Sequence, residues 1–137
     1  EVIEKWLPGT VYHEMDHVVR WRTTGYGTTP LEAMVSEGLA TVFESEMWPS
    51  ALTPWGALDT GEEDRYLTLL AEKKELIDKP YRHDAWFFGS TDELPRWFGY
   101  KMGTLIVRKA IENTQNNIIQ YTNVPAREIV QASRVIF

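Results

Sequence analysis

Two histidines and a glutamate stand close together near the start of the chain, in the sequence His13-Glu14-Met15-Asp16-His17. Residues four positions apart lie one turn apart on the same face of an α-helix, so both imidazoles could reach one metal ion. Glu14 would lie beside that ion, where its carboxylate can take a proton from a metal-bound water. The spacing therefore predicts a helix-borne zinc site able to hydrolyse peptide bonds.

A zinc site of this kind needs a third protein ligand and an open position for water. The chain has three histidines and no cysteine, which excludes disulfide bonds and cysteine-based zinc sites and leaves carboxylates as the main candidates. Glu37 follows His17 by 20 positions, inside the apolar segment 35–40. Gly38 beside it indicates a close approach of another backbone or of substrate. We predict Glu37 as the third ligand. Glu44 is the alternative ligand, and a solvated helix acid is the other interpretation of Glu37.

The surrounding segments carry the signals of two helices. Residues 11–21 form a helix that would carry both histidines, preceded by a turn at 7–10 with Thr10 as its N-cap. Residues 29–32 combine a capping box with proline at the first helical position, and apolar residues then recur at helical intervals to Met47. Consecutive helices joined by a short turn pack antiparallel. An acid in the middle of the second helix can therefore face the histidines of the first.

Three further helices are predicted, at 60–77, 94–112 and 125–136, opened by a capping box, Pro95 and Pro125 respectively. The stretch 81–93 is aromatic and irregular, residues 113–117 are a polar break, and 117–121 is a candidate for extended structure. Five helices without a convincing strand pattern indicate a mostly α fold. Residues 1–137 are interpreted as one domain, either whole or lacking an N-terminal part.

Composition limits the classes of partner. A net charge of −6 argues against nucleic acid or an anionic membrane as the main partner. No apolar run reaches the length of a membrane span, and the compartment stays open because proteins of many compartments lack cysteine. The oligomeric state is not encoded in any pattern of the sequence that we recognise.

The chain resembles a known group of enzymes. The His13–His17 motif, followed about twenty residues later by Ser36-Glu37-Gly38-Leu39-Ala40, resembles the gluzincin class of zinc metallopeptidases. The longer string is more similar to one family of bacterial predicted zinc-dependent proteases, long filed as a domain of unknown function. The matching segments are 12–14, 17–21, 31–40 and 94–103.

The resemblance implies a zincin-like helical domain in which His13, His17 and Glu37 bind Zn²⁺. It also implies that Glu14 acts as general base for a zinc-activated water that hydrolyses a peptide or protein substrate. A soluble bacterial protein, cytoplasmic or exported, would be expected.

Two departures from the family pattern limit this transfer. A small sheet usually precedes the HExxH helix, but only twelve residues precede the motif here, so that sheet and its substrate-holding edge strand would be short or missing. Some gluzincins carry an aspartate one turn after the third ligand, where this chain has Thr41. The group that orients a zinc-binding histidine must then come from elsewhere.

Peptide hydrolysis also needs a hydrogen-bond donor for the oxyanion of the tetrahedral intermediate. We predict Tyr100 for this role, because Gly99 and Gly103 on either side allow its helix to approach the zinc helices closely. His83 is the rival donor. The simpler interpretations are a core tyrosine with a satisfied hydroxyl and a loop histidine without a role.

Other polar and aromatic residues remain open between two roles. Arg96 could bind a substrate carboxylate or form a surface salt bridge. Several aromatic residues either shape a substrate cleft or pack in the core: Trp48, Trp55, Trp86 and Phe87.

Three functions are compatible with these patterns. The first is a zinc metallopeptidase, and the second is a catalytically inactive zinc-binding or regulatory module of zincin fold. The third, a helical structural domain without metal, is disfavoured by the joint spacing of His13, His17 and Glu37.

Overall fold

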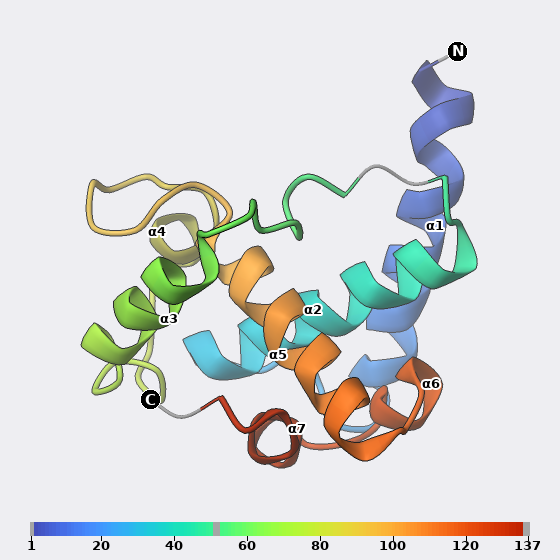
Figure 1. Ribbon diagram of the computed structural model, residues 1–137. Coiled ribbons are helices and arrows are strands. Elements are labelled where there is room, and N and C mark those ends of the chain that lie inside the picture. Colours follow the sequence, from blue (N-terminus) through green and yellow to red (C-terminus); the bar gives the residue numbers. More distant parts are fainter. Residues whose placement is uncertain (1, 51–52, 136–137) are drawn as a thin grey trace.

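The computed structural model describes residues 2–50 and 53–135, and these residues form helices joined by turns and loops, with no strand. The mostly α fold is thus confirmed. The described part contains seven helices (Figure 1): α1 (Val2–Trp21), α2 (Pro30–Met47), α3 (Glu63–Glu72), α4 (His83–Phe87), α5 (Phe98–Thr114), α6 (Ile118–Tyr121) and α7 (Ala126–Ser133). Within these residues, no helix has both the length and the apolar character that crossing a membrane requires.

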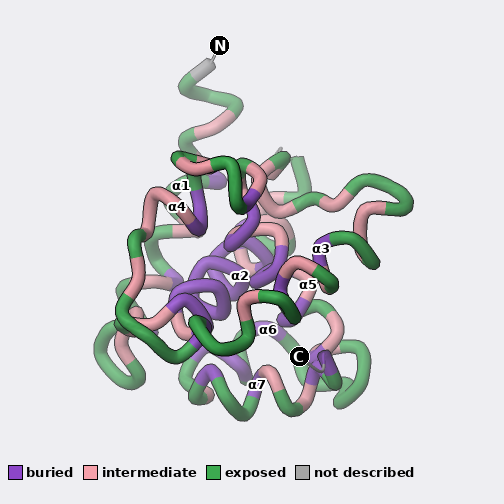
Figure 2. Tube along the Cα trace, turned by 90° about the vertical axis from the view of Figure 1, so that its left-hand side faces the viewer, coloured by how far each residue is buried: buried purple, intermediate pink, exposed green. Residues whose placement is uncertain are grey.

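Helix α2 runs through the middle of the molecule, and the burial map shows it as the most enclosed element (Figure 2). Its start is the predicted capping box: the amide of Glu32 donates to the Thr29 hydroxyl at 3.3 Å, and the Thr29 amide donates to the Glu32 carboxylate at 3.2 Å. The helix is apolar on most sides, as expected of one surrounded by others. Helices α1, α5, α6 and α7 all contact it.

Helices α2 and α5 touch at two glycines. A Cβ atom on Gly38 would lie 2.2 Å from the carbonyl carbon of Gly103, and one on Gly103 would lie 1.8 Å from the carbonyl oxygen of Met34. The predicted close approach at Gly38 is therefore confirmed, with a backbone as the neighbour. Gly99 serves a different contact, because a Cβ there would lie 2.5 Å from the ring of Phe87.

The predicted start of the first helix is wrong. Helix α1 begins at Val2 and continues through Pro8, so Thr10 is not an N-cap. The Thr10 hydroxyl instead donates to the carbonyl of Trp6, one turn earlier, at 3.1 Å. Pro8 removes one amide donor from the helix, in a part of α1 that is largely exposed to solvent.

Two further helix boundaries differ from the prediction. Helix α3 has no capping box, because the Glu62 carboxylate accepts from the amide of Asp59 at 3.0 Å, and it ends at Glu72. The chain then turns so that the carbonyl of Ile77 accepts from the amide of Leu31, in the first turn of α2, at 3.1 Å. Helix α5 starts only at Phe98, because Trp97 has a left-handed backbone with a φ of 66°.

The remaining helices show how local capping decides short segments. The stretch 117–121 is helical instead of extended, because Asn117 and Gln120 form a reciprocal capping box at 2.8 and 2.9 Å. The irregular stretch 81–93 contains the short helix α4. Pro125 is the N-cap of α7 and not its first residue. The predicted continuation of this helix beyond Ser133 is wrong, because Arg134 is a left-handed C-cap with a φ of 57°; the predicted end, Ile136, lies outside the described residues.

Candidate metal centre

The face of α1 that carries the two histidines packs against α2. The contacts run in opposite order along the two helices: the Tyr12 ring meets Phe43 at 6.2 Å, whereas Arg20, two turns later, meets the Ser36 hydroxyl at 3.2 Å. His13 and His17 lie between these contacts, opposite the buried middle of α2.

Three side chains converge at this place. Nε2 of His13 lies 3.2 Å from Nε2 of His17 and 3.1 Å from Oε2 of Glu37. Nε2 of His17 lies 3.4 Å from the same carboxylate oxygen. The two imidazoles are half-buried and Glu37 is buried, with 6% of its surface exposed. His13, His17 and Glu37 thus form the group of potential ligands that the sequence predicted would lie together.

The spacing of the three atoms fits a tetrahedral metal ion. Zinc binds imidazole nitrogen and carboxylate oxygen at about 2.0–2.2 Å, so neighbouring ligand atoms in a tetrahedron lie roughly 3.3–3.5 Å apart. The distances of 3.1–3.4 Å between the three atoms are close to that value. Two imidazole nitrogens and a carboxylate oxygen also form a ligand set that zinc prefers.

The charges around these three residues favour a bound cation. Burial lowers the pKa of His13, but hydrogen bonds and charges from Glu37 and Glu44 outweigh it and raise the pKa from 6.5 to about 9. Burial likewise raises the pKa of Glu37, whereas the hydrogen bonds and charges of the two histidines bring it down from 4.5 to about 2. Without metal, a proton on His13 balances the buried carboxylates, and a bound cation would replace that proton.

Glu44 lies on the opposite side of His13 from Glu37. Its Oε2 is 3.2 Å from Nδ1 of His13, and the residue is 2% exposed. A carboxylate on the second ring nitrogen fixes the tautomer of a metal-binding histidine and makes the first nitrogen a better ligand. Glu44 therefore lies where a group that orients a metal-binding histidine is expected. The sequence did not locate this group, because Thr41 stands at the position where some gluzincins have an orienting aspartate.

Tyr26 contacts the cluster, and the sequence analysis missed it. It lies in the turn between α1 and α2, and its hydroxyl donates to Oε1 of Glu37 at 2.8 Å. Burial and the charge of Glu37 raise its pKa, so the hydroxyl keeps its proton and remains a donor. The sequence did contain a signal for this residue, because Tyr26 stands between two glycines, Gly25 and Gly27. In the structure both glycines have positive φ angles, 75° and 102°.

A second polar network, also missed, anchors the histidine helix. Asp16 and Arg20, both buried, point from α1 toward the segment after α6. The Thr122 hydroxyl donates to Asp16 at 3.1 Å, and the Arg20 guanidinium donates to the carbonyls of Thr122 and Val124, each at 2.9 Å. These bonds hold the last turns of α1 in place and so fix the direction of His17.

The two predicted oxyanion donors both lie near the cluster. Tyr100 is half-buried, and burial together with the charges of Glu37 and Glu14 raises its pKa. His83 stacks on Phe87 with ring centroids 4.3 Å apart, and its Nδ1 is 3.1 Å from the Tyr81 hydroxyl. Burial lowers the pKa of His83 despite the charge of Glu37, so its ring is neutral near pH 7.

The other residues left open by the sequence divide between core and cleft. Trp86 and Phe87 are core residues, Trp48 is the half-buried C-cap of α2, and Trp55 lines a cavity next to His13. Arg96 lies over the ring of Trp97, with its guanidinium carbon 4.6 Å from the ring centroid.

The comparison with known families agrees with this geometry. Residues 3–131 match the family described as "Predicted Zn-dependent protease (DUF2268)". The chain belongs to this family. Its description makes zinc the cofactor of the family, and the cluster formed by His13, His17 and Glu37 is close enough to bind such an ion. The chain has no match among curated proteins or solved structures.

Proposed function

We propose that the chain is a gluzincin-type zinc metallopeptidase in which His13, His17 and Glu37 hold the zinc ion. The observation that carries the proposal is the convergence of two imidazole nitrogens on one carboxylate oxygen at 3.1 and 3.4 Å. Three such atoms leave a fourth tetrahedral position for water or substrate, which distinguishes a catalytic site from a closed structural one.

Glu14 is the proposed general base. It follows His13 on α1, is exposed to solvent, and lies close enough to Tyr100 to influence its pKa. Zinc at this site would polarise the scissile carbonyl and lower the pKa of a water molecule. Glu14 takes a proton from the attacking water and delivers it to the leaving amine, so one carboxylate serves both steps.

Tyr100 is the proposed oxyanion donor. Two observations favour it over His83: Tyr100 lines the same cavity as His13, and its raised pKa keeps the hydroxyl protonated. The phenol also interacts with Glu14 and Glu37, which would flank the reacting carbonyl. His83 instead has one ring nitrogen engaged by Tyr81.

A second function, an inactive zinc-binding or regulatory module, is favoured by one observation. Residues 2–50 and 53–135 contain no strand, so this part of the chain offers no strand edge for a peptide backbone to pair with. Both functions require the metal ligands, but only the peptidase requires Glu14.

Glu14→Gln separates the two functions. We expect the zinc-loaded wild-type chain to cleave a mixed peptide library, and Glu14→Gln to lower kcat/KM by about 10²–10⁴-fold through loss of the base. Cleavage is measured by mass spectrometry at equal zinc content for both proteins. Glu46→Gln, at an exposed position of α2, is the matched control and should cleave like the wild type. Equal rates for wild type and Glu14→Gln would refute the peptidase and leave the binding module.

A further inference from the structure

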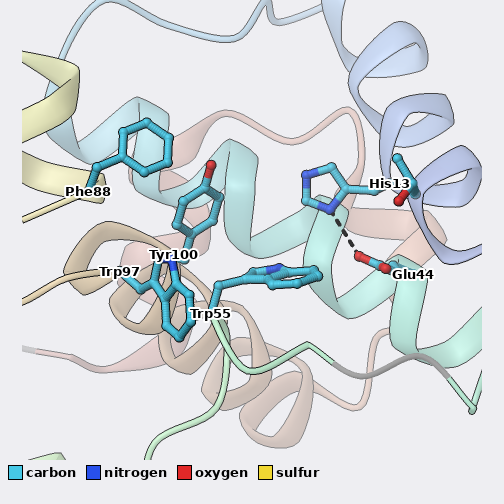
Figure 3. A pocket seen from close by; sticks show the side chains of 7 residues that line it. His13, Glu44, Trp55, Phe88, Trp97 and Tyr100 are labelled. Atoms are coloured by element: carbon cyan, nitrogen blue, oxygen red, sulfur yellow. Dashed lines mark hydrogen bonds and ion pairs between the residues drawn. The ribbon is translucent and has the colours of Figure 1, made fainter. Parts of the chain in front are cut away.

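A cavity of about 250 Å³ opens beside His13, on the side of Glu44. Four of its lining side chains are aromatic and come from three parts of the chain, the loop before α3, the end of α4 and the start of α5 (Figure 3): Trp55, Phe88, Trp97 and Tyr100. In the close-up Phe88, Trp97 and Tyr100 lie opposite His13 and Glu44, and the ring of Trp55 lies between the two groups. The aromatic residues thus stand next to the proposed metal ligand without belonging to the ligand set.

The volume suits one large side chain. A cavity of about 150 Å³ in a protein interior holds a benzene molecule, whereas drug-sized ligands occupy roughly 300–1,000 Å³. At about 250 Å³ the cavity next to His13 lies between these sizes. This volume suits the ring of one phenylalanine or tyrosine together with its first carbon atoms.

The backbone of Trp97 indicates that its ring is placed there for a purpose. Its φ of 66° and ψ of 15° are left-handed, a conformation that disfavours bulky residues and that glycine adopts freely. The conformation is held by two hydrogen bonds of 2.9 Å, from the Trp97 amide to the Phe87 carbonyl and from the Lys101 amide to the Trp97 carbonyl. Strained residues of this kind cluster at functional sites. A tryptophan here contributes its ring to the cavity at the expense of backbone stability.

Trp55 packs against α1, the helix that carries the two histidines. The ring of Trp55 lies 6.0 Å from that of Trp6 on α1. The next residue, Gly56, packs tightly on α2 and α5, since a Cβ there would lie 2.6 Å from Thr41 and 2.9 Å from Thr104. Trp55 therefore keeps a defined distance from His13 although it lies in a loop.

Charge decides which large side chains fit. The carboxylate of Glu44 lines the cavity and lies 3.2 Å from Nδ1 of His13. An acidic substrate side chain would be repelled by this carboxylate. An aromatic or long aliphatic side chain packs against the four aromatic rings and loses water, which is favourable.

We propose that this cavity is the subsite that selects the peptide bond to be cleaved, and that it takes one large apolar side chain, aromatic by preference. The proposal rests on the peptidase function, because it identifies the substrate class of that same site.

The test compares peptides that differ at one position, which carries phenylalanine, leucine, alanine or glutamate. We expect the zinc-loaded chain to cleave the phenylalanine peptide at least about 10-fold faster, in kcat/KM, than the alanine peptide. Trp97→Gly removes the ring and relieves the left-handed backbone, so the variant should fold while its preference for phenylalanine falls about 10-fold. Trp21→Ala, at an exposed position of α1, is the control and should keep the preference.

A binding measurement separates failure of this proposal from failure of the peptidase function. Glu14→Gln is titrated with N-acetyl-phenylalanine amide and N-acetyl-alanine amide, and the indole N–H signals of Trp55 and Trp97 are followed by NMR. The proposal predicts shifts with the phenylalanine amide alone, even if no peptide is cleaved. Absence of these shifts, or an unchanged preference in an active Trp97→Gly variant, would overturn it.

Discussion

Two walls enclose the proposed site, and they are built differently. We call His13, His17, Tyr26, Glu37 and Glu44 the metal wall, and Trp55, Phe88, Trp97 and Tyr100 the aromatic wall. The metal wall comes from two packed helices and the turn between them, and its side chains are joined by hydrogen bonds or close polar contacts of 2.8–3.4 Å. The aromatic wall comes from loops and the start of α5, and its members are half-buried or exposed.

This difference indicates that the helices serve metal binding and the loops serve substrate selectivity. Rigid helices hold ligand atoms at fixed distances, as metal binding demands. Loops on such a scaffold carry substrate selectivity, because they can vary without disturbing the ligands. Changes in the metal wall should therefore alter zinc affinity, and changes at Trp55, Phe88 or Trp97 should alter substrate preference, whereas Tyr100, the proposed oxyanion donor, should also affect the rate of cleavage. Substitutions and a change of pH can test whether zinc affinity and substrate preference are separate in this way.

The largest effect is expected for His17→Ala. Removing one of three protein ligands should weaken zinc binding by about 1,000-fold or more, measured by competition with a chromogenic chelator. The aromatic wall should still bind N-acetyl-phenylalanine amide, because His17 does not line that cavity. If His17→Ala lost both zinc binding and binding of N-acetyl-phenylalanine amide, the two walls would not be independent.

Glu44→Gln should have a smaller effect on zinc. The substitution keeps the size of the side chain and removes the charge that faces Nδ1 of His13, so zinc affinity should fall by about 10–100-fold. Glu46→Gln, on the exposed side of the same helix, is expected to bind zinc like the wild type. A loss as large as that of His17→Ala would mean that Glu44 is itself a ligand, the alternative left open by the sequence.

A change of pH should affect the stability of the metal-free protein. The raised pKa of His13, about 9, stabilises the fold fully below pH 6.5, and this contribution is lost as the pH rises through 9. The lowered pKa of Glu37 contributes above pH 4.5, and this contribution is lost as the pH falls toward 2. The group therefore stabilises the metal-free chain most between pH 4.5 and 6.5.

Between pH 6.5 and 9 the free energy of unfolding should fall by on the order of 2–3 kcal/mol, measured by urea unfolding in chelator. Glu37→Gln should remove most of this dependence. Zinc affinity should rise over the same pH range, because zinc then displaces fewer protons from His13. A metal-free stability independent of pH in the wild type would contradict the described contacts of His13.

The sequence anticipated the metal wall better than the aromatic wall, for a physical reason. The spacing of His13 and His17 and the capping box at Thr29 are local patterns, and one short turn joins their helices. Gly38 also signalled the close backbone contact that it makes. The direction of Glu44 toward Nδ1 of His13 depends on how α1 crosses α2, which no local pattern encodes.

The aromatic wall joins residues far apart in the chain, from Trp55 to Tyr100. Its formation depends on a left-handed tryptophan at position 97 and on the packing of Gly56, and neither follows from hydrophobic periodicity. The continuation of α1 through Pro8 was missed for a different reason. Proline is a strong local signal for a helix break, but the helix continues through it here.

The most direct test of the account is the position of the metal. Crystals of the zinc-loaded chain, measured at the zinc absorption edge, should show one anomalous peak about 2.0–2.2 Å from Nε2 of His13, Nε2 of His17 and a carboxylate oxygen of Glu37. No fourth protein side chain should reach the ion. A zinc ion bound elsewhere, or one closed off by Glu44 as a fourth protein ligand, would contradict the proposed catalytic centre.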